Sequence, residues 1–173
     1  GVKISREDCQ DLDRALSLEW LESNGRGGFS SGTVAGANTR RYHALLLTAR
    51  KPPNERLVLV NHLDEWVDVE GRSIPLSTNL YSGAVYPDGY KACVSFTADP
   101  WPTWTYDCDG AVIQREILCL QGRDLVIVRW RLLRSTNGEV TLRVRPMLSG
   151  RDYHSTHHEN PGLDGACSEA TQL

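Results

Sequence analysis

The chain has no long apolar run, no closely spaced cysteine pair and no large excess of charge of either sign. No stretch reaches the roughly 20 apolar residues of a membrane-spanning helix, and the N-terminal GVKISREDCQ lacks the apolar segment of a signal peptide. The 19 basic and 22 acidic side chains leave a formal net charge of -3, which gives no general attraction to nucleic acid or to an anionic membrane. We therefore expect a soluble, cytoplasmic protein that binds neither.

Motifs for metals and phosphates are equally scarce. The five cysteines are odd in number and form no C-x-x-C pair, so they predict neither a disulfide framework nor a zinc site. The glycine-rich stretch that begins at Asn24 contains neither G-x-G-x-x-G nor G-K-[ST], which argues against a phosphate-binding loop. A polar group near the end could hold a metal, although solvated side chains are the simpler interpretation: His154, His157, His158 and Glu159. We expect no cofactor and no bound metal.

Alternation of apolar and polar residues with a period of two dominates from about residue 40 onward. It is clear over 126–132 and 140–145, with a turn at 135–138 between them. Further strands are predicted over 57–60, 66–69, 92–97 and 111–120. One helix is plausible within 7–21, with Ser5 as its N-cap, and a strand over 18–22 is an equal alternative. This pattern predicts a mostly β fold, an antiparallel two-sheet sandwich with at most one short helix near the N-terminus.

The domain organisation is predicted from where the alternation stops. Residues 1–149 are expected to form the sandwich domain, whereas residues 150–173 have almost no large apolar side chains and no periodicity. We therefore expect an irregular, weakly attached tail or linker after residue 149. Because no element is completed there, the chain is expected to be the front part of a longer protein.

Aromatic residues cluster in DPWPTWTYD and in the preceding AVYPDGYKA. The prolines disfavour a central strand, so some of these rings are expected at an edge or in a loop. Exposed flat rings could stack on sugars, using Trp101, Trp104, Tyr86 and Tyr90. In the alternative interpretation, Trp101 and Trp104 cap the core of the sandwich.

The stretch EWLESNGRGGFSSGTVAGANTRRYHALLL, followed by PPNERLVLVNHLDE, resembles the N-terminal region of bacterial and archaeal glycogen debranching enzymes of the amylo-α-1,6-glucosidase type. Looser similarity, which includes RDYH at residues 151–154, extends over most of the chain. A small departure is Ala44, where the family usually has glycine.

The resemblance implies a supersandwich-like N-terminal domain joined to a C-terminal (α/α) barrel that carries the catalytic carboxylates. Glycoside hydrolysis needs two carboxyl groups that flank the scissile bond. The candidate pairs here all lie at turns or strand edges: Asp64 with Glu65, Asp107 with Asp109, and Asp152 with Glu159. We therefore assign no catalytic residue and expect a non-catalytic module, whose partners are its own catalytic domain and an α-glucan such as glycogen or limit dextrin.

The residues assigned to substrate binding or domain docking are Asn24, Asn38, Arg40, Arg41, His43, Trp101 and Trp104. Arg40, Arg41 and His43 offer fixed donors for carboxylates or sugar hydroxyls and are expected to face the barrel near its substrate cleft. Alternatively, the two arginines form ion pairs with Glu19, Asp64 or Glu65 inside the sandwich. A free-standing carbohydrate-binding or assembly module remains the second functional hypothesis.

Overall fold

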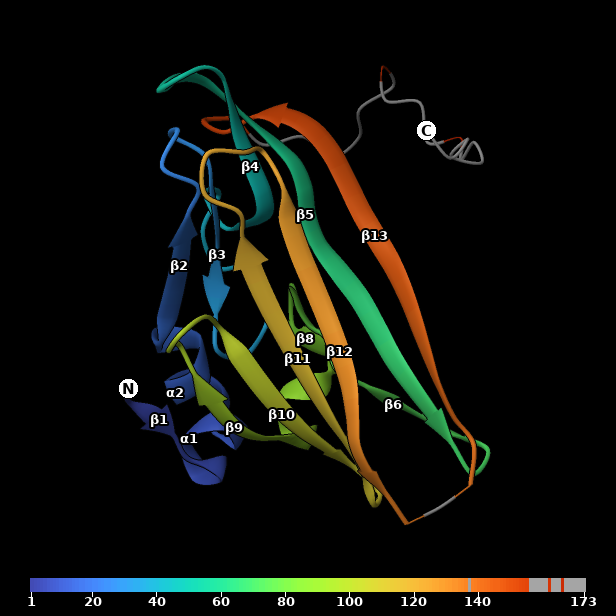
Figure 1. Ribbon diagram of the computed structural model, residues 1–173. Helices are drawn as coiled ribbons and strands as arrows, with labels where there is room; N and C mark the ends of the chain where they lie inside the picture. Colours follow the sequence, from blue (N-terminus) through green and yellow to red (C-terminus); the bar gives the residue numbers. More distant parts are fainter. Residues whose placement is uncertain (137, 156–161, 163–165, 167–173) are drawn as a thin grey trace.

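Two antiparallel sheets pack face to face in the computed structural model, which describes residues 1–136, 138–155, 162 and 166 (Figure 1). One sheet, sheet A, has the order β1 (Lys3–Ile4), β9 (Cys93–Thr97), β10 (Thr103–Cys108), β11 (Ala111–Cys119) and β12 (Val126–Ser135). The other, sheet B, has the order β13 (Val140–Asp152), β5 (Asn54–Val69), β4 (Ala44–Lys51), β3 (Phe29–Thr33) and β2 (Glu19–Ser23), with β6 (Arg72–Pro75) also paired to β5. A separate hairpin consists of β7 (Thr78–Tyr81) and β8 (Ala84–Asp88). The predicted antiparallel sandwich is confirmed.

The N-terminal region holds two short helices where at most one was predicted. The Ser5 hydroxyl caps α1 (Arg6–Gln10), as expected, by accepting from the Asp8 amide. Asp11 then adopts an extended backbone, and its side chain caps α2 (Leu12–Ser17). A capping residue in the middle of the segment therefore divides it into two helices. A 3-10 helix follows β8 at Gly89–Ala92, and no helix in the described part of the chain is long and apolar enough to cross a membrane.

The longest strands extend beyond their predicted limits. The segments predicted at 57–60 and 66–69 belong to the single strand β5, and β13 pairs with it from Val140 opposite Val69 to Asp152 opposite Leu57. β13 thus continues past residue 149, where the domain was expected to end. Gly150 has a φ of 62° and lies at a register shift between Leu148 and Arg151, so it forms a bulge within the strand. In the sequence, the same glycine looks like the end of regular structure.

The main core fills the space between the sheets. Trp104 is 1% exposed and packs against Trp20 and Phe96, with ring centroids 5.4 Å and 4.8 Å apart. A buried ion pair crosses this core, since Arg115 of β11 lies 3.1 Å from Glu65 of β5, and the Trp130 indole also donates to Glu65 at 2.7 Å. Burial raises the pKa of Glu65, while Arg115 and the indole N–H oppose that rise. The two sheets are therefore joined by polar as well as apolar contacts.

A smaller apolar cluster lies apart from the main core. It consists of the fully buried Ala44, Leu47 and Val58, with Phe29 and Tyr153 packed on them. Because these residues come from β3, β4, β5 and the segment after β13, the chain after Gly150 covers part of sheet B. The predicted weakly attached tail is therefore wrong for residues 151–153.

Candidate functional site

A pocket of about 550 Å³ lies beside this small cluster, at the face of sheet B that points away from sheet A. The exposed side of β2 forms one wall, as Leu21 is 60% exposed while its neighbour Trp20 points into the core. The loop before β4 and the segment after β13 supply the other walls. The lining residues are Glu19, Trp20, Leu21, Phe29, Ser31, Arg40, Tyr42, His43, Arg56, Tyr153 and His154.

The polar edge of the pocket is built around Glu19. Its Oε1 atom accepts from Arg40 Nε at 2.5 Å and lies 3.4 Å from Nε2 of the buried His43. The Thr39 amide donates to His43 Nδ1 at 3.1 Å, which assigns the ring proton to Nε2 and directs it toward Glu19. The hydrogen bond from Arg40 lowers the pKa of Glu19, and burial lowers the pKa of His43. The pocket thus presents a charged carboxylate held between a guanidinium and a neutral imidazole.

An aromatic wall stands on the other side of the pocket. The Tyr42 and Tyr153 ring centroids are 5.4 Å apart, and His154 packs on Tyr153 at 3.8 Å. Arg41 lies over the Tyr42 ring, with its Cζ atom 5.2 Å from the centroid, and its Nη1 atom donates to the His154 main-chain oxygen at 3.1 Å. The two sequence motifs, NTRRYH and RDYH, therefore meet at one site. Flat rings beside fixed donors and acceptors suit either a neutral polar ligand or a protein segment.

The family model described as "Glycogen debranching enzyme N terminal" matches residues 18–172. The chain belongs to this family. The search of curated proteins and the search of solved structures gave no match. Because the matched region begins at Leu18 and includes both motifs, the pocket lies entirely within the debranching-enzyme N-terminal domain.

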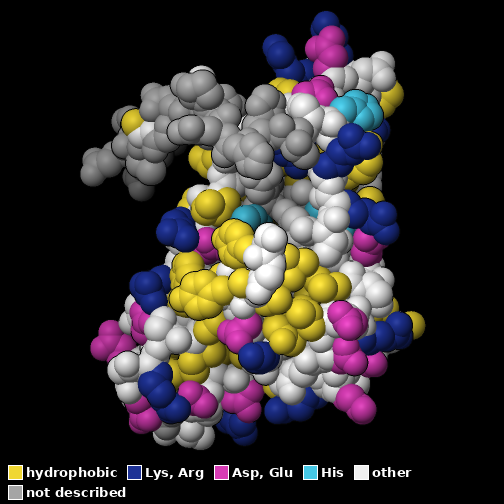
Figure 2. All heavy atoms as spheres, turned by 180° about the vertical axis from the view of Figure 1, so that it is seen from behind, with side chains coloured by type: hydrophobic (Ala, Val, Ile, Leu, Met, Phe, Trp, Pro, Cys, Tyr) yellow, Lys and Arg dark blue, Asp and Glu magenta, His cyan; other side chains and the backbone are white. Residues whose placement is uncertain are grey.

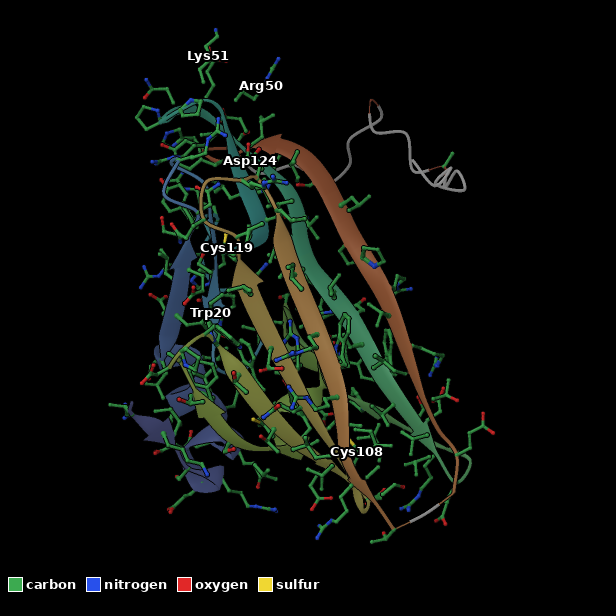
Figure 3. The ribbon with its side chains drawn as sticks, viewed as in Figure 1. Trp20, Arg50, Lys51, Cys108, Cys119 and Asp124 are labelled. Atoms are coloured by element: carbon green, nitrogen blue, oxygen red, sulfur yellow. The ribbon has the colours of Figure 1, made fainter. Side chains whose placement is uncertain are left out.

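In this debranching-enzyme domain, Asn24 holds two turns together and lies outside the pocket. It is 1% exposed, and its Oδ1 atom accepts from the amides of Arg26 and Gly28. Its Nδ2 atom donates to Asp124 Oδ1 at 2.9 Å. Asp124 belongs to the β11–β12 loop, at the end of the sandwich where Arg50 and Lys51 also lie (Figure 3). Gly25 has a φ of 72°, in the left-handed region that glycine adopts readily and that a tight turn at Asn24-Gly25 uses. The buried position and these bonds give Asn24 a structural role.

The other predicted site residues are dispersed. Asn38 is exposed and donates to the Asn61 main-chain oxygen at 3.1 Å, away from the pocket lining. Trp104 is in the core and donates to the Val34 oxygen, so it has no surface for a substrate. Trp101 is only partly buried and lies at another pocket, formed by β11 and β12. A stacking row that includes Trp104 is therefore wrong, and the core-capping interpretation is confirmed for this residue.

The proposed ion pairs inside the sandwich form with other arginines. Arg40 does pair with Glu19, but this contact is at the surface, where the Arg40 side chain is 64% exposed. Asp64 and Glu65 have alternate orientations on β5, and they pair with Arg145 and Arg115 respectively. The remaining candidate carboxylates also have structural contacts: Asp107 with Arg6, Asp109 with Arg72, and Asp152 with the His154 amide, while Glu159 lies outside the described residues.

The sequence interpretation missed the residues that complete the pocket, chiefly Leu21, Phe29, Tyr42, Arg56 and Tyr153. A signal was present in β2, where Leu21 occupies the outward position of an alternating strand. Because single exposed apolar residues are common on protein surfaces, Leu21 indicates a covered site only together with the neighbouring rings of Tyr42 and Tyr153. The four described cysteines are free and buried, and Cys108 and Cys119 lie near opposite ends of β11 (Figure 3).

Proposed function

We propose that the chain is a non-catalytic module of a glycogen debranching enzyme that hydrolyses α-1,6-glucosidic branch linkages. In this proposal, the pocket on sheet B packs against the catalytic domain and helps to shape its α-glucan site. The family match identifies the kind of enzyme. The observation that carries the docking role is that Tyr42, Tyr153 and His154 line one pocket although they come from distant parts of the chain. Arg41, beside the pocket, holds these parts together through its contacts with the Tyr42 ring and the His154 oxygen.

The composition of the pocket supports a docking role over a catalytic one. Glu19 is the one carboxyl group among the described residues that line it. Glycoside hydrolysis requires two carboxyl groups, and Glu19 is held as a charged partner of Arg40. Aromatic and arginine side chains are the residue types most often found at the energetic centre of protein interfaces. The proposed partners are therefore the catalytic domain of the same enzyme and, at their junction, the α-glucan.

The proposal includes a cytoplasmic location and no cofactor for this module. The location is supported by the four described cysteines, which are free and buried, as is usual in a reducing compartment. The alternative, a free-standing carbohydrate-binding module, relied on four exposed rings that stack on sugars. One of these four, Trp104, is inside the core and cannot contact a sugar.

The docking role is tested by Arg41→Ala in the enzyme that contains this chain. We expect kcat/KM on a branched limit dextrin to fall at least about tenfold, because Arg41 orders Tyr42 and the segment at His154. The matched control is Arg72→Ala, which removes another exposed arginine that pairs with Asp109 away from the pocket. Equal activity of wild type and Arg41→Ala would contradict the docking role, as would an equal loss in the control.

A further inference from the structure

A second pocket, of about 240 Å³, lies on the outer face of sheet A. Two cross-strand pairs of β11 and β12 form its floor, Glu116 opposite Arg129 and Leu118 opposite Ile127. The intervening residues of β11, such as Ile117, point into the core, so the floor residues all face outward. Trp101, from the segment before β10, closes one side.

The polar groups of this pocket are fixed in position. Glu116 is 8% exposed, its Oε1 atom accepts from the Trp101 indole at 3.2 Å, and its Oε2 atom accepts from Arg129 Nε at 2.6 Å. Arg131 adds a longer contact of 3.5 Å to the same oxygen. The hydrogen bond from Arg129 lowers the pKa of Glu116. The carboxylate is thus charged at neutral pH and holds the indole ring in place.

The backbone beside Trp101 is held as well. The Thr103 hydroxyl donates to the Trp101 oxygen at 2.9 Å, and the Ile117 amide donates to the Pro102 oxygen at 3.0 Å. A ring held in this way loses little conformational freedom when a ligand binds, which favours recognition. The pocket is therefore organised before any ligand arrives.

We propose that this pocket binds one pyranose ring of an α-glucan, as a surface subsite on the sheet opposite the docking pocket. Trp101, Leu118 and Ile127 offer an apolar surface to the C–H groups of the sugar. The Glu116–Arg129 pair offers an acceptor and donors to its hydroxyls, and the pairing of opposite charges favours a neutral ligand. The volume is just below the roughly 300 Å³ of the smallest typical ligand pockets, which suits a single ring.

The choice of α-glucan rests on the proposed function, whereas the choice of a sugar over a protein segment rests on the pocket. The Arg129 and Arg131 side chains are 52% and 51% exposed. A single pyranose fills only the pocket of about 240 Å³ and leaves Arg131, which does not line it, in water. A protein segment across the strands would cover both guanidiniums, which is unfavourable unless each gains new partners. Sugar hydroxyls can instead replace the hydrogen bonds of water one for one.

The binding test uses the 173-residue chain itself and two probes, glycogen in native gels and maltoheptaose in calorimetry. We expect glycogen, but not the β-linked hydroxyethyl cellulose, to retard the wild-type chain. Trp101→Ala should weaken both glycogen retardation and maltoheptaose affinity at least tenfold. The matched control is Tyr81→Ala, because Tyr81 is also aromatic, is 63% exposed and lies on β7, away from this pocket.

If Trp101→Ala fails to fold, the same two binding measurements are made on Arg129→Ala. Arg129 is half exposed, and Arg131 still pairs with Glu116 in this variant, so the variant should fold and bind less tightly. The subsite is overturned if glycogen does not retard the wild-type protein, or if a folded Trp101→Ala or Arg129→Ala variant binds unchanged. An equal loss of binding in Tyr81→Ala would also overturn it. Because this binding does not require the catalytic domain, its failure is distinguishable from failure of the docking role.

Discussion

Arg151 Nη2 donates a hydrogen bond of 2.6 Å to the main-chain oxygen of Arg41, a residue 110 positions earlier in the chain. The same guanidinium donates from Nη1 to the Ser155 oxygen at 2.9 Å, and the whole residue is only 9% exposed. Arg151 therefore joins the loop before β4 to the segment after β13. It adds a buried link between two walls of the docking pocket, which also meet through the Arg41–His154 hydrogen bond and the Tyr42–Tyr153 contact.

Removing the segment after Gly150 should destabilise the domain. A chain that ends at Gly150 loses the Arg151 hydrogen bonds and the packing of Tyr153 on the small apolar cluster. We expect its melting temperature to lie several degrees below that of a chain that ends at Ser155, which retains both, because a loss of about 1 kcal/mol shifts Tm by several degrees in a domain of this size. Thermal denaturation of the two truncations measures the difference. Identical melting temperatures would show that the segment after β13 does not stabilise the sandwich.

Arg41→Ala and Arg115→Ala should have very different effects on the stability of the chain. Arg41 is exposed, so its removal should lower the free energy of unfolding by less than about 1 kcal/mol. Arg115 is buried and pairs with Glu65, so its removal leaves a buried carboxylate without its counter-charge, at a cost of about 3–5 kcal/mol. Urea denaturation gives both values. A large loss for Arg41→Ala would assign this residue a structural role and remove the basis of the docking test.

Gly28→Ala should destabilise the turn between β2 and β3. A Cβ atom at this position would lie 2.6 Å from Asn24 Nδ2 and 2.7 Å from the Leu47 oxygen, so either the Asn24 bonds or β4 must shift. A loss of about 1–3 kcal/mol is expected from such overpacking. Gly138→Ala is the control, since a Cβ atom there meets no atom within 4 Å. Equal unfolding free energies for the two variants would argue against the close packing at Gly28.

The stability of the chain should fall as the pH decreases below about 6.5. Burial lowers the pKa values of His43 and His62 in the folded state, so the unfolded chain takes up protons first. The stabilisation is fully present above the unfolded pKa of about 6.5 and is lost as the pH falls through the lower folded values. Melting temperatures between pH 7.5 and 5.5 should therefore decrease, with a smaller decrease in His43→Gln. The same decrease in both proteins would exclude His43 as a contributor.

Local features of the fold were predictable because they depend on neighbouring residues. The alternation over 126–132 appears in β12, and the Ser5 hydroxyl caps a helix as predicted. The long motif around Arg40 was likewise sufficient to predict the family. Each of these follows from backbone preference or from contiguous residues, which the sequence displays directly.

The sequence by itself thus determined the strands, the antiparallel class and the family, whereas the tertiary structure decided which side chains are available. Trp101 and Trp104 are three positions apart, yet one lies at a surface pocket and the other is buried, because Trp104 belongs to β10 opposite Phe96 and Trp101 precedes the strand. Tyr42 and Tyr153 form one wall only because β13 continues past the Gly150 bulge. Alternation gives two faces to every strand, but only sheet packing and register determine which face is covered and which distant residues meet there.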